Sequence, residues 1–282
     1  MVTPPSRDRE AIDAILGDRL DAAKTARRAA AASLEVARNA EDTWQRMRDA
    51  VRAGHHAAIM HLFRREASLF SSLRSHSDPS VPFLEELYRS SEQAAREGAR
   101  HFPSSFPSAC AAQNIQIDTT SRHPRYTVKE FIEITVDDRA LEATIVPRDG
   151  QSLTLPLDVD PIVERLRSET HRLFEEMRDT KRLLAGLRKA YRAVLREEKK
   201  KAGEELPLRR VANRLSKNWA HFKYDEFNID LARIVREGTT TVDKDRLHLN
   251  HTRDTRQGIL LHGLERSGYF GFISFKPGDT NA

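Results

Sequence analysis

Residues 160–201 read DPIVERLRSETHRLFEEMRDTKRLLAGLRKAYRAVLREEKKK and contain the clearest periodic pattern in the chain. Apolar or small residues recur there at alternating intervals of three and four, as they do along one side of an α-helix. The positions that form this seam are Val163, Leu166, Thr170, Leu173, Met177, Thr180, Leu184, Leu187, Tyr191 and Val194. The pattern predicts a single coiled-coil-like helix within residues 160–204, about 60 Å long at 1.5 Å per residue.

A helix of that length cannot bury its apolar seam alone, so it needs a partner. The partner is either the alanine-rich N-terminal helix of the same chain, giving a helical hairpin, or a second copy of residues 160–201. Because the seam needs a partner, we expect self-association, or pairing with other protein subunits, through it. A long helix in an ordinary bundle would show nearly the same pattern and is the alternative.

Residues 1–101 form a predicted N-terminal helical region, with proline-free sequence from residue 9 up to a break at Gly54. Further helices are expected over residues 55–73 and 82–101. The first helix has a weaker heptad seam, in which small and charged residues replace several of the apolar ones. Its members are Leu16, Leu20, Ala23, Arg27, Ala30, Leu34, Ala37, Glu41, Trp44, Arg48 and Val51.

Residues 102–114 are rich in Pro, Ser and Ala and are predicted to be a linker. Period-two alternation follows, which is typical of strands with one buried face. Strands are expected at residues 115–119, in YTVKEFIEITVDD and RALEATIVP, and after the turn signal Asp149–Gly150. Residues 115–159 are thus a predicted antiparallel β-insert of three or four strands.

Residues 205–282 are predicted to form a basic, mainly helical C-terminal domain. From residue 181 onward the chain has 22 Lys and Arg against 13 Asp and Glu, a net charge of +9, whereas the whole chain carries +5. A concentration of positive charge on a helical module is typical of a phosphate-binding surface, although charged runs are often only solvated helix faces. Candidate phosphate-binding residues are Arg209, Arg210, Arg214 and Lys217.

The segment Thr252–Phe275, TRDTRQGILLHGLERSGYFGFISF, is predicted to be a helix over residues 253–266 followed by an aromatic strand. Short helices are expected in LRRVANRLSKNW and DEFNIDLARIVREG, and a short helix or turn in TTTVDKDRLHLN. Over residues 225–276 this order of elements resembles the winged helix-turn-helix family. The resemblance implies that the third helix enters the major groove of DNA, so Arg253, Arg256 and Gln257 would contact bases or phosphates.

Known chemical motifs do not point to an enzyme. Acidic residues cluster in the β-insert, but the lysine of a metal-dependent nuclease core does not follow Glu142, so a nuclease is only a third alternative. Neither histidine group matches a HExxH pattern, and with Cys110 as the single cysteine we expect no thiolate metal site and no cofactor.

Composition and charge leave two main functional hypotheses for a predicted α+β, predominantly helical protein. With 32% charged and 39% hydrophobic residues and no long apolar run, the 282-residue chain is expected to be cytoplasmic, without a membrane contact. The first hypothesis is a non-enzymatic, complex-forming protein that binds duplex DNA. The alternative is a structural subunit that binds other proteins in a larger assembly.

Overall fold

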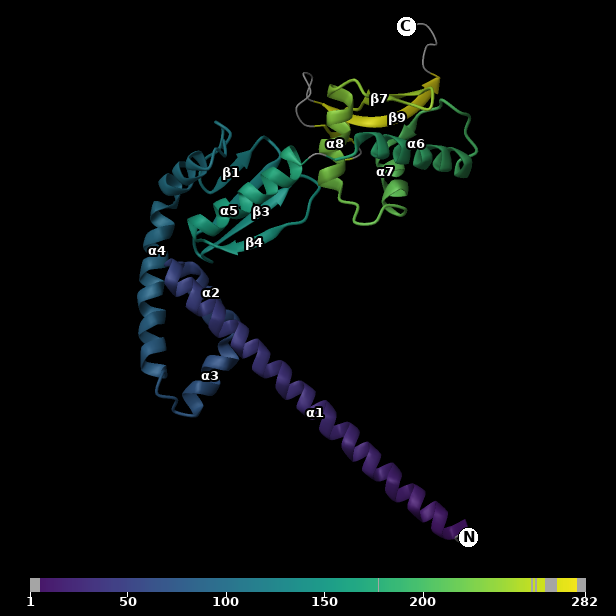
Figure 1. The fold of residues 1–282 in the computed structure, drawn as a ribbon. Coiled ribbons are helices and arrows are strands. Elements are labelled where there is room, and N and C mark those ends of the chain that lie inside the picture. The colour runs from purple at the N-terminus through teal and green to yellow at the C-terminus, as the bar shows by residue number, and fades with distance from the viewer. Residues whose placement is uncertain (1–5, 177, 255, 257, 262–267, 278–282) are drawn as a thin grey trace. The chain divides into compact units, whose positions relative to one another are not determined.

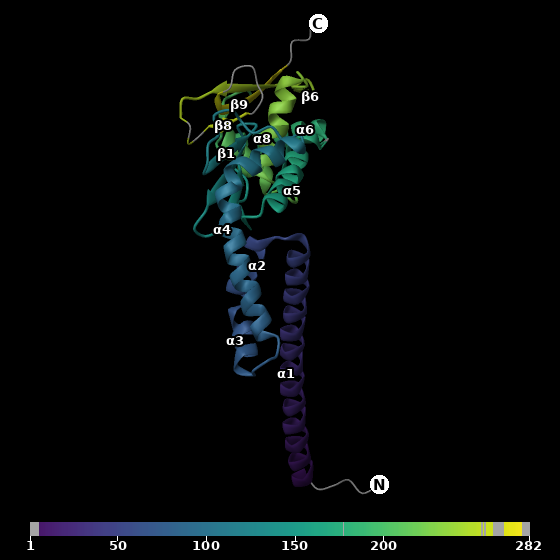
Figure 2. The same ribbon diagram turned by 90° about the vertical axis from the view of Figure 1, so that its left-hand side faces the viewer.

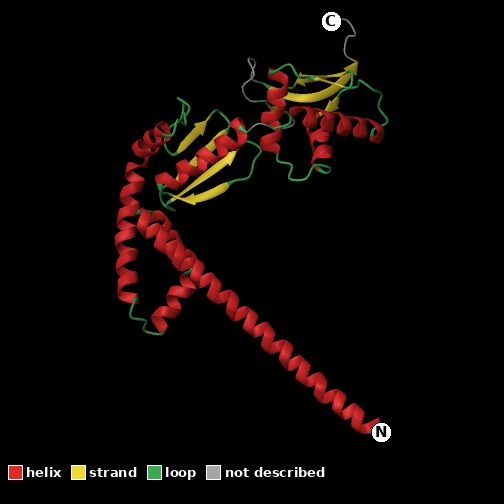
Figure 3. Ribbon diagram, viewed as in Figure 1, coloured by secondary structure: helices red, strands yellow, loops and turns green. Residues whose placement is uncertain are grey.

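The computed structural model describes residues 6–176, 178–254, 256, 258–261 and 268–277, and of residues 6–18 it describes the helix backbone alone. The chain divides into two compact units, Met1–Gly98 and Ala99–Ala282. The first consists of helices, and the second combines helices with two antiparallel sheets, drawn in yellow in Figure 3. The predicted α+β class, with helices predominating and small antiparallel sheets, is confirmed.

The first unit contains the helices expected for the N-terminal region, with one further break. Gly54 has a φ of +69°, a left-handed conformation that suits glycine, and it ends the first helix as predicted. The helix expected over residues 55–73 is divided at Glu66. The elements are α1 (Ser6–Ala53), α2 (His56–Arg65), α3 (Ala67–Ser75) and the start of α4 (Val81–Ala112).

The core of the first unit is formed by α2, α3, the start of α4 and the C-terminal end of α1. The course of α1 can be followed in Figures 1 and 2. Trp44 meets the ring of Phe70 edge-on at 5.7 Å between ring centroids, and Phe70 also contacts Phe63 at 4.3 Å. The buried members of this cluster are Met47, Ala50, Ile59, Leu62, Phe70 and Leu84. Residues 19–39 of α1 are all exposed.

The predicted linker at residues 102–114 is wrong, because α4 continues through it to Ala112 with Pro103 and Pro107 inside the helix. Phe102, Phe106 and Cys110 recur every four residues and are fully buried, and the two phenylalanine rings stack at 4.9 Å. Burial of this stripe outweighs the hydrogen bonds that each proline removes, since an aromatic side chain in a core contributes several kcal/mol.

The β-insert is confirmed as a four-stranded antiparallel sheet in the order β1-β2-β3-β4. Its buried face contains Val128, Ile132, Ile134 and Val136, as the alternation predicts. The strand expected at residues 115–119 is wrong, because only an isolated bridge joins Ile117 to Val128. The strands are β1 (Arg125–Val128), β2 (Ile132–Asp137), β3 (Glu142–Pro147) and β4 (Leu153–Pro156).

The single helix predicted for residues 160–201 is wrong. The segment forms α5 (Val159–Thr170), a π-helix η1 (His171–Glu175) and α6 (Thr180–Glu197). The side chain of Asp179 accepts a hydrogen bond from the Arg182 backbone N–H at 2.9 Å, which caps α6 and starts a new helix. Most of the predicted seam is buried by other parts of the same chain and not by a second copy. The buried seam residues are Val163, Leu166, Thr170, Leu173, Leu184, Leu187, Tyr191 and Val194. Met177 lies outside the described residues.

The second sheet is built around the aromatic strand predicted at the end of the chain. That strand, β9, lies between β5 and β7, and β6 pairs with the far side of β7. The sheet and the helices α6, α7 and α8 share one apolar core. The elements are β5 (Leu206–Pro207), α7 (Leu208–Ser216), α8 (Tyr224–Arg236), β6 (Thr241–Val242), β7 (Asp245–His251), β8 (Ile259–Leu260) and β9 (Tyr269–Pro277).

Two helices expected in the C-terminal domain are not formed in its described part. TTTVDKDRLHLN, expected to be a short helix or a turn, forms the hairpin of β6 and β7, with a turn at Asp243 and Lys244, both at positive φ. The helix expected over residues 253–266 is not present among its described residues, which form a loop and then β8. Ile259 is fully buried and pairs with Phe270, so strand pairing with β9 competes with helix formation at this point.

Candidate functional site

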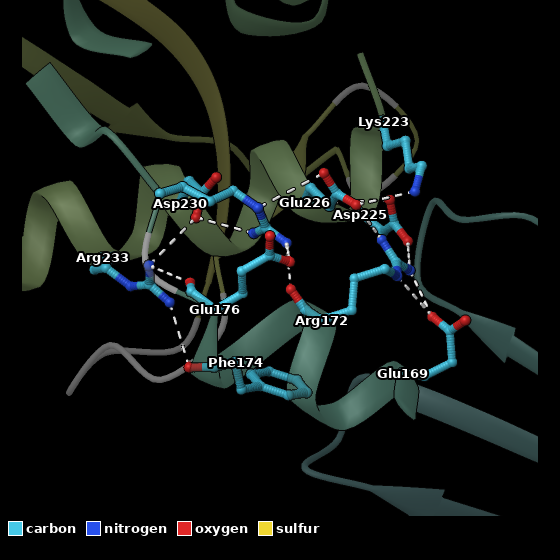
Figure 4. A network of polar contacts seen from close by, with 10 residues as sticks. Glu169, Arg172, Phe174, Glu176, Lys223, Asp225, Glu226, Asp230 and Arg233 are labelled. Atoms are coloured by element: carbon cyan, nitrogen blue, oxygen red, sulfur yellow. Dashed lines mark hydrogen bonds and ion pairs between the residues drawn. The ribbon is translucent and has the colours of Figure 1, made fainter. Parts of the chain in front are cut away.

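The most elaborate polar cluster of the second unit joins η1 to α8 (Figure 4). Arg172, on η1, lies among three carboxylates. Its Nη2 is 2.6 Å from Glu169 Oε2 and 2.5 Å from Asp225 Oδ2. Its Nη1 is 2.5 Å from Glu226 Oε1. We call this cluster, with Arg178, Asp230 and Arg233, the η1–α8 network.

Two further arginines extend the network along α8. Arg178 lies 3.2 Å from Asp230 and 3.7 Å from Glu226, and it donates to the backbone carbonyl of Arg172. Arg233 donates to the carbonyl oxygens of Glu176 and Phe174 at 3.2 and 3.3 Å. Backbone carbonyls at the irregular end of η1 are therefore satisfied by arginines, which explains how the chain leaves a helical path there.

The electrostatics of the network differ between neighbouring carboxylates. Burial would raise the pKa of Glu226, but hydrogen bonds from Arg172 and Lys223 and the charge of Arg178 lower it overall. Burial raises the pKa of Asp230 despite the nearby Arg178 and Arg233. Burial opposes the charge of Arg172, yet its hydrogen bonds to carboxylates raise its pKa overall. The network is therefore organised around charge pairing.

The turn between β3 and β4 covers another part of α8. Asn228 Nδ2 donates to Asp149 Oδ2 at 2.9 Å, and Arg209 Nη2 lies 3.6 Å from Asp149 Oδ1. Gly150 approaches α8 so closely that a Cβ there would lie 2.9 Å from Asp225 Oδ2. Residues 225–234 of α8 are buried or, for Glu226, half-buried. This helix therefore packs within the second unit over most of its length.

The residues predicted to bind DNA come from two elements, α7 with the residue that follows it and the loop between β7 and β8. Arg209 donates to the Gly258 carbonyl and pairs with Asp149. Arg210 lies 2.7 Å from Glu198, the C-cap of α6, and Arg214 lies 3.4 Å from Glu197 of α6. These arginines are thus partly neutralised within the chain. Lys217 is exposed after α7.

The three residues predicted to lie on a recognition helix belong to the segment between β7 and β8. Arg253 and Arg256 are exposed in a loop, in which Asp254 Oδ1 accepts from the Arg256 backbone N–H at 2.9 Å. Gln257 lies outside the described residues. The two arginines are available to an anion, but from a loop and not from a helix.

The acidic residues of the β-insert have structural roles. Asp137 Oδ1 accepts backbone N–H bonds from Arg139 and Ala140, both at 2.9 Å, and Asp138 pairs with His123 at 2.8 Å. Within the described residues, no three His, Cys, Asp or Glu side chains gather closely enough to hold a metal ion. The metal-dependent nuclease alternative gains no support from this geometry.

The sequence patterns did not single out the η1–α8 network. A signal was present: Asp225, Glu226 and Asp230 lie within six residues of a helix whose other buried positions are mostly apolar. Carboxylates on a buried helix require cationic partners. Their partners, Arg172 and Arg178, lie outside the predicted apolar seam of residues 160–201, so the periodicity gives them no role.

The exposed stretch of α1 is the second candidate interaction surface. Leu20, Leu34 and Val51 expose 56%, 53% and 45% of their surface, and all three belong to the weak seam. A shallow depression that is widely open to solvent lies on the same helix. It is lined by Ala37, Ala40, Glu41, Trp44, Gln45 and Arg48.

Comparisons of the chain with models of known protein families, with curated proteins and with solved structures found no match. Among the described residues, no helix is both long and apolar enough to cross a lipid bilayer. The two sites described above are therefore the basis for a function.

Proposed function

We propose that this protein is a structural subunit that joins other chains through the exposed seam of α1. The observation that carries the proposal is the exposure of every residue from 19 to 39 in a helix that continues to Ala53. Leucines at the seam positions 20 and 34 lie in this stretch. Most of the stability of a helix in a protein comes from packing one face, and this stretch of α1 has no such packing within its unit.

The exposed apolar residues of the seam contribute favourable free energy to association. Burying a leucine or valine side chain contributes about 1.5–3 kcal/mol. Burial of Leu20, Leu34 and Val51 together would supply several kcal/mol. The small residues Ala23, Ala30 and Ala37 would allow the backbone of a partner helix to approach closely. A partner helix is the element whose shape fits such a stripe.

The C-terminal part also favours an assembly role. The order α6, β5, α7, α8, β7, β9, with β9 between β5 and β7, supports a winged-helix-like arrangement in which α8 is the third helix. In that family the third helix reads the major groove. Here the η1–α8 network covers α8, and residues 225–234 are buried or half-buried, so this helix is not free to enter a DNA groove.

A second candidate function, contact with duplex DNA, depends on the loop after β7. In a winged-helix-like arrangement this loop belongs to the wing, and it carries the exposed Arg253 and Arg256. Two exposed arginines contribute to binding of phosphate, without sequence reading by a helix. The DNA hypothesis is thus retained for the wing and not for α8.

The experiment that tests the subunit role is affinity purification of the tagged, full-length protein from its native extract after nuclease treatment. Leu34→Asp places a charge on the seam, whereas Val36→Asp changes an exposed apolar residue (69% exposed) on another side of α1. We expect stoichiometric protein chains, including untagged copies of this protein, with the wild type and Val36→Asp, and their loss with Leu34→Asp. Recovery of the tagged wild-type protein with no other protein chain bound to it would refute the subunit role.

A further inference from the structure

We infer that the partner of α1 is a second copy of α1, paired in the antiparallel direction about a twofold axis near residues 35 and 36. This inference rests on the proposed function and specifies its partner. It predicts a homodimer whose interface extends over residues 20–51 of each chain. An overlap of that length is about 48 Å at 1.5 Å per residue.

The seam of α1 is complementary to itself in this direction. Positions at equal distances from residues 35 and 36 face each other: Leu34 and Ala37, Ala30 and Glu41, Arg27 and Trp44, Ala23 and Arg48, Leu20 and Val51. In antiparallel coiled coils the two kinds of seam position, which alternate along the helix, face each other across the interface. Each facing pair here follows that rule, and twofold symmetry repeats it.

The charged seam residues decide the direction of pairing. In a parallel, in-register pair, Arg27, Glu41 and Arg48 would each face the same residue of the second copy. Like charges in contact on a helix interface are destabilising. In the antiparallel pair Arg27 faces the Trp44 ring of the second copy, and Glu41 of that copy lies one helical turn away. An arginine over a tryptophan and beside a carboxylate is favourably placed.

The depression on α1 gives the second copy a place to dock. Its lining includes the seam residues Ala37, Glu41, Trp44 and Arg48. In the antiparallel register these residues face Leu34, Ala30, Arg27 and Ala23 of the second copy. The largest apolar side chain among these, Leu34, would thus pack beside the depression as a knob packs into a hole. The small alanines allow the two helices to approach closely.

The intrachain packing of α1 leaves this seam accessible. Thr43, Met47 and Ala50, which are buried in the first unit, lie on a different side of α1 from Leu34, Glu41 and Arg48. Trp44 lies at the boundary, half-buried against Phe70. A second helix can therefore cover the seam without displacing α2 or α3.

Disulfide cross-linking of the full-length protein tests the direction. A disulfide requires Cα atoms within about 7 Å, so cysteines report which positions meet. We expect that a mixture of Leu20→Cys and Val51→Cys proteins forms a covalent dimer under mild oxidation. Neither protein should do so alone. A dimer of Leu20→Cys with itself would show parallel pairing and overturn the inference.

Charge exchange with sedimentation tests the register. We expect Arg27→Glu to weaken dimerisation by about tenfold, and Arg27→Glu combined with Glu41→Arg to restore most of it. Arg28→Glu, the same change beside the seam, should have little effect. Failure of the double variant to recover would overturn the register.

The oligomeric state of the wild type separates this inference from the proposed function. A wild-type protein that sediments as a monomer at about 50 µM, well above the Kd of an ordinary homodimer, would exclude the homodimer. If such a protein still retained another chain through Leu34 in the affinity experiment, the subunit role would stand with a different partner. Circular dichroism of each variant excludes loss of the helix as the cause.

Discussion

Arg172 illustrates how single charges hold the second unit together. Its side chain is only 22% exposed, and the carboxylates of Glu169 and Asp225 beside it are 8% and 4% exposed. An ion pair so enclosed is not in itself strongly stabilising, because desolvation offsets much of the attraction. Loss of one member, however, leaves the others buried without compensation. Removal of Arg172 is therefore expected to lower the stability of the protein by more than the intact ion pairs contribute to it.

Arg172→Met is expected to destabilise the protein by about 3–5 kcal/mol, the usual result of removing one partner of a buried ion pair. Arg210→Met, which breaks a pair with the arginine side chain 55% exposed, is expected to cost about 0–1 kcal/mol. Urea denaturation of the full-length protein measures both. Equal losses in the two variants would contradict the assignment of Arg172 to a buried network.

Glu226 makes the network sensitive to acid. Its pKa is lowered in the folded protein below the ordinary value of 4.5, so the unfolded chain binds a proton more readily. The stabilising contribution is therefore fully present above the unfolded pKa and is lost as the pH falls through the folded one. We expect Glu226→Gln to be less stable than the wild type at pH 7, with the difference shrinking below about pH 4.5. Denaturation at several pH values measures this, and a difference that grows in acid would contradict it.

Among the elements, the break between η1 and α6 determines where the predicted long helix ends. Periodicity alone could not reveal it, because Leu173 and Leu184 keep the same helical spacing although they pack in different places. What separates them is the Asp179 cap and the arginine bonds to backbone carbonyls, which are tertiary effects. The β-insert was predictable because alternation over two neighbouring strands specifies one buried face.

Asp179→Ala tests the break directly. As a cap, Asp179 is worth about 1 kcal/mol, so its removal should destabilise the protein by that amount. Asp179→Asn retains a capping side chain and should be nearly neutral. In a continuous helix the alanine would instead be slightly stabilising, because alanine is the better helix former. Thermal or urea unfolding distinguishes the two signs.

Other elements were misassigned for equally local reasons. Residues 102–114 suggest a linker through their prolines, yet the spacing of Phe102, Phe106 and Cys110 is that of a helix face. Ile259 and Leu260 lie in an apolar helical pattern but pair with β9 as a short strand. Competing partners decide these cases, and a single sequence does not show which partner is near. The same limit hid the η1–α8 network, whose two sides, residues 169–178 and residues 225–233, lie about fifty positions apart in the sequence.

For the whole molecule, any interaction with DNA should depend on the exposed arginines of the loop after β7 and not on the arginines that are paired within the chain. Each phosphate contact contributes about 0.9 to the slope of log affinity against log salt. We expect Arg253→Ala with Arg256→Ala to reduce that slope by about 2, and Arg210→Ala with Arg214→Ala to change it little. A fluorescence titration with duplex DNA from about 50 mM salt upward measures the slopes. A larger effect of the second pair would place the contact on α7.

The η1–α8 network also limits how the chain can be divided in the laboratory. A cut near Thr180 would separate the sheet of β1 to β4 from the sheet of β5 to β9. A fragment that began at Thr180 would contain Asp225, Glu226 and Asp230 but would lack Arg172 and Arg178. Asp225 would then lose its arginine, and Glu226 and Asp230 would retain only Lys223 and Arg233. Such a fragment should be poorly soluble, and one that began near Ala99 should fold. The η1 segment, where the predicted long helix is interrupted, thus connects the half of the second unit with β1 to β4 to the half with β5 to β9 through its ion pairs with α8.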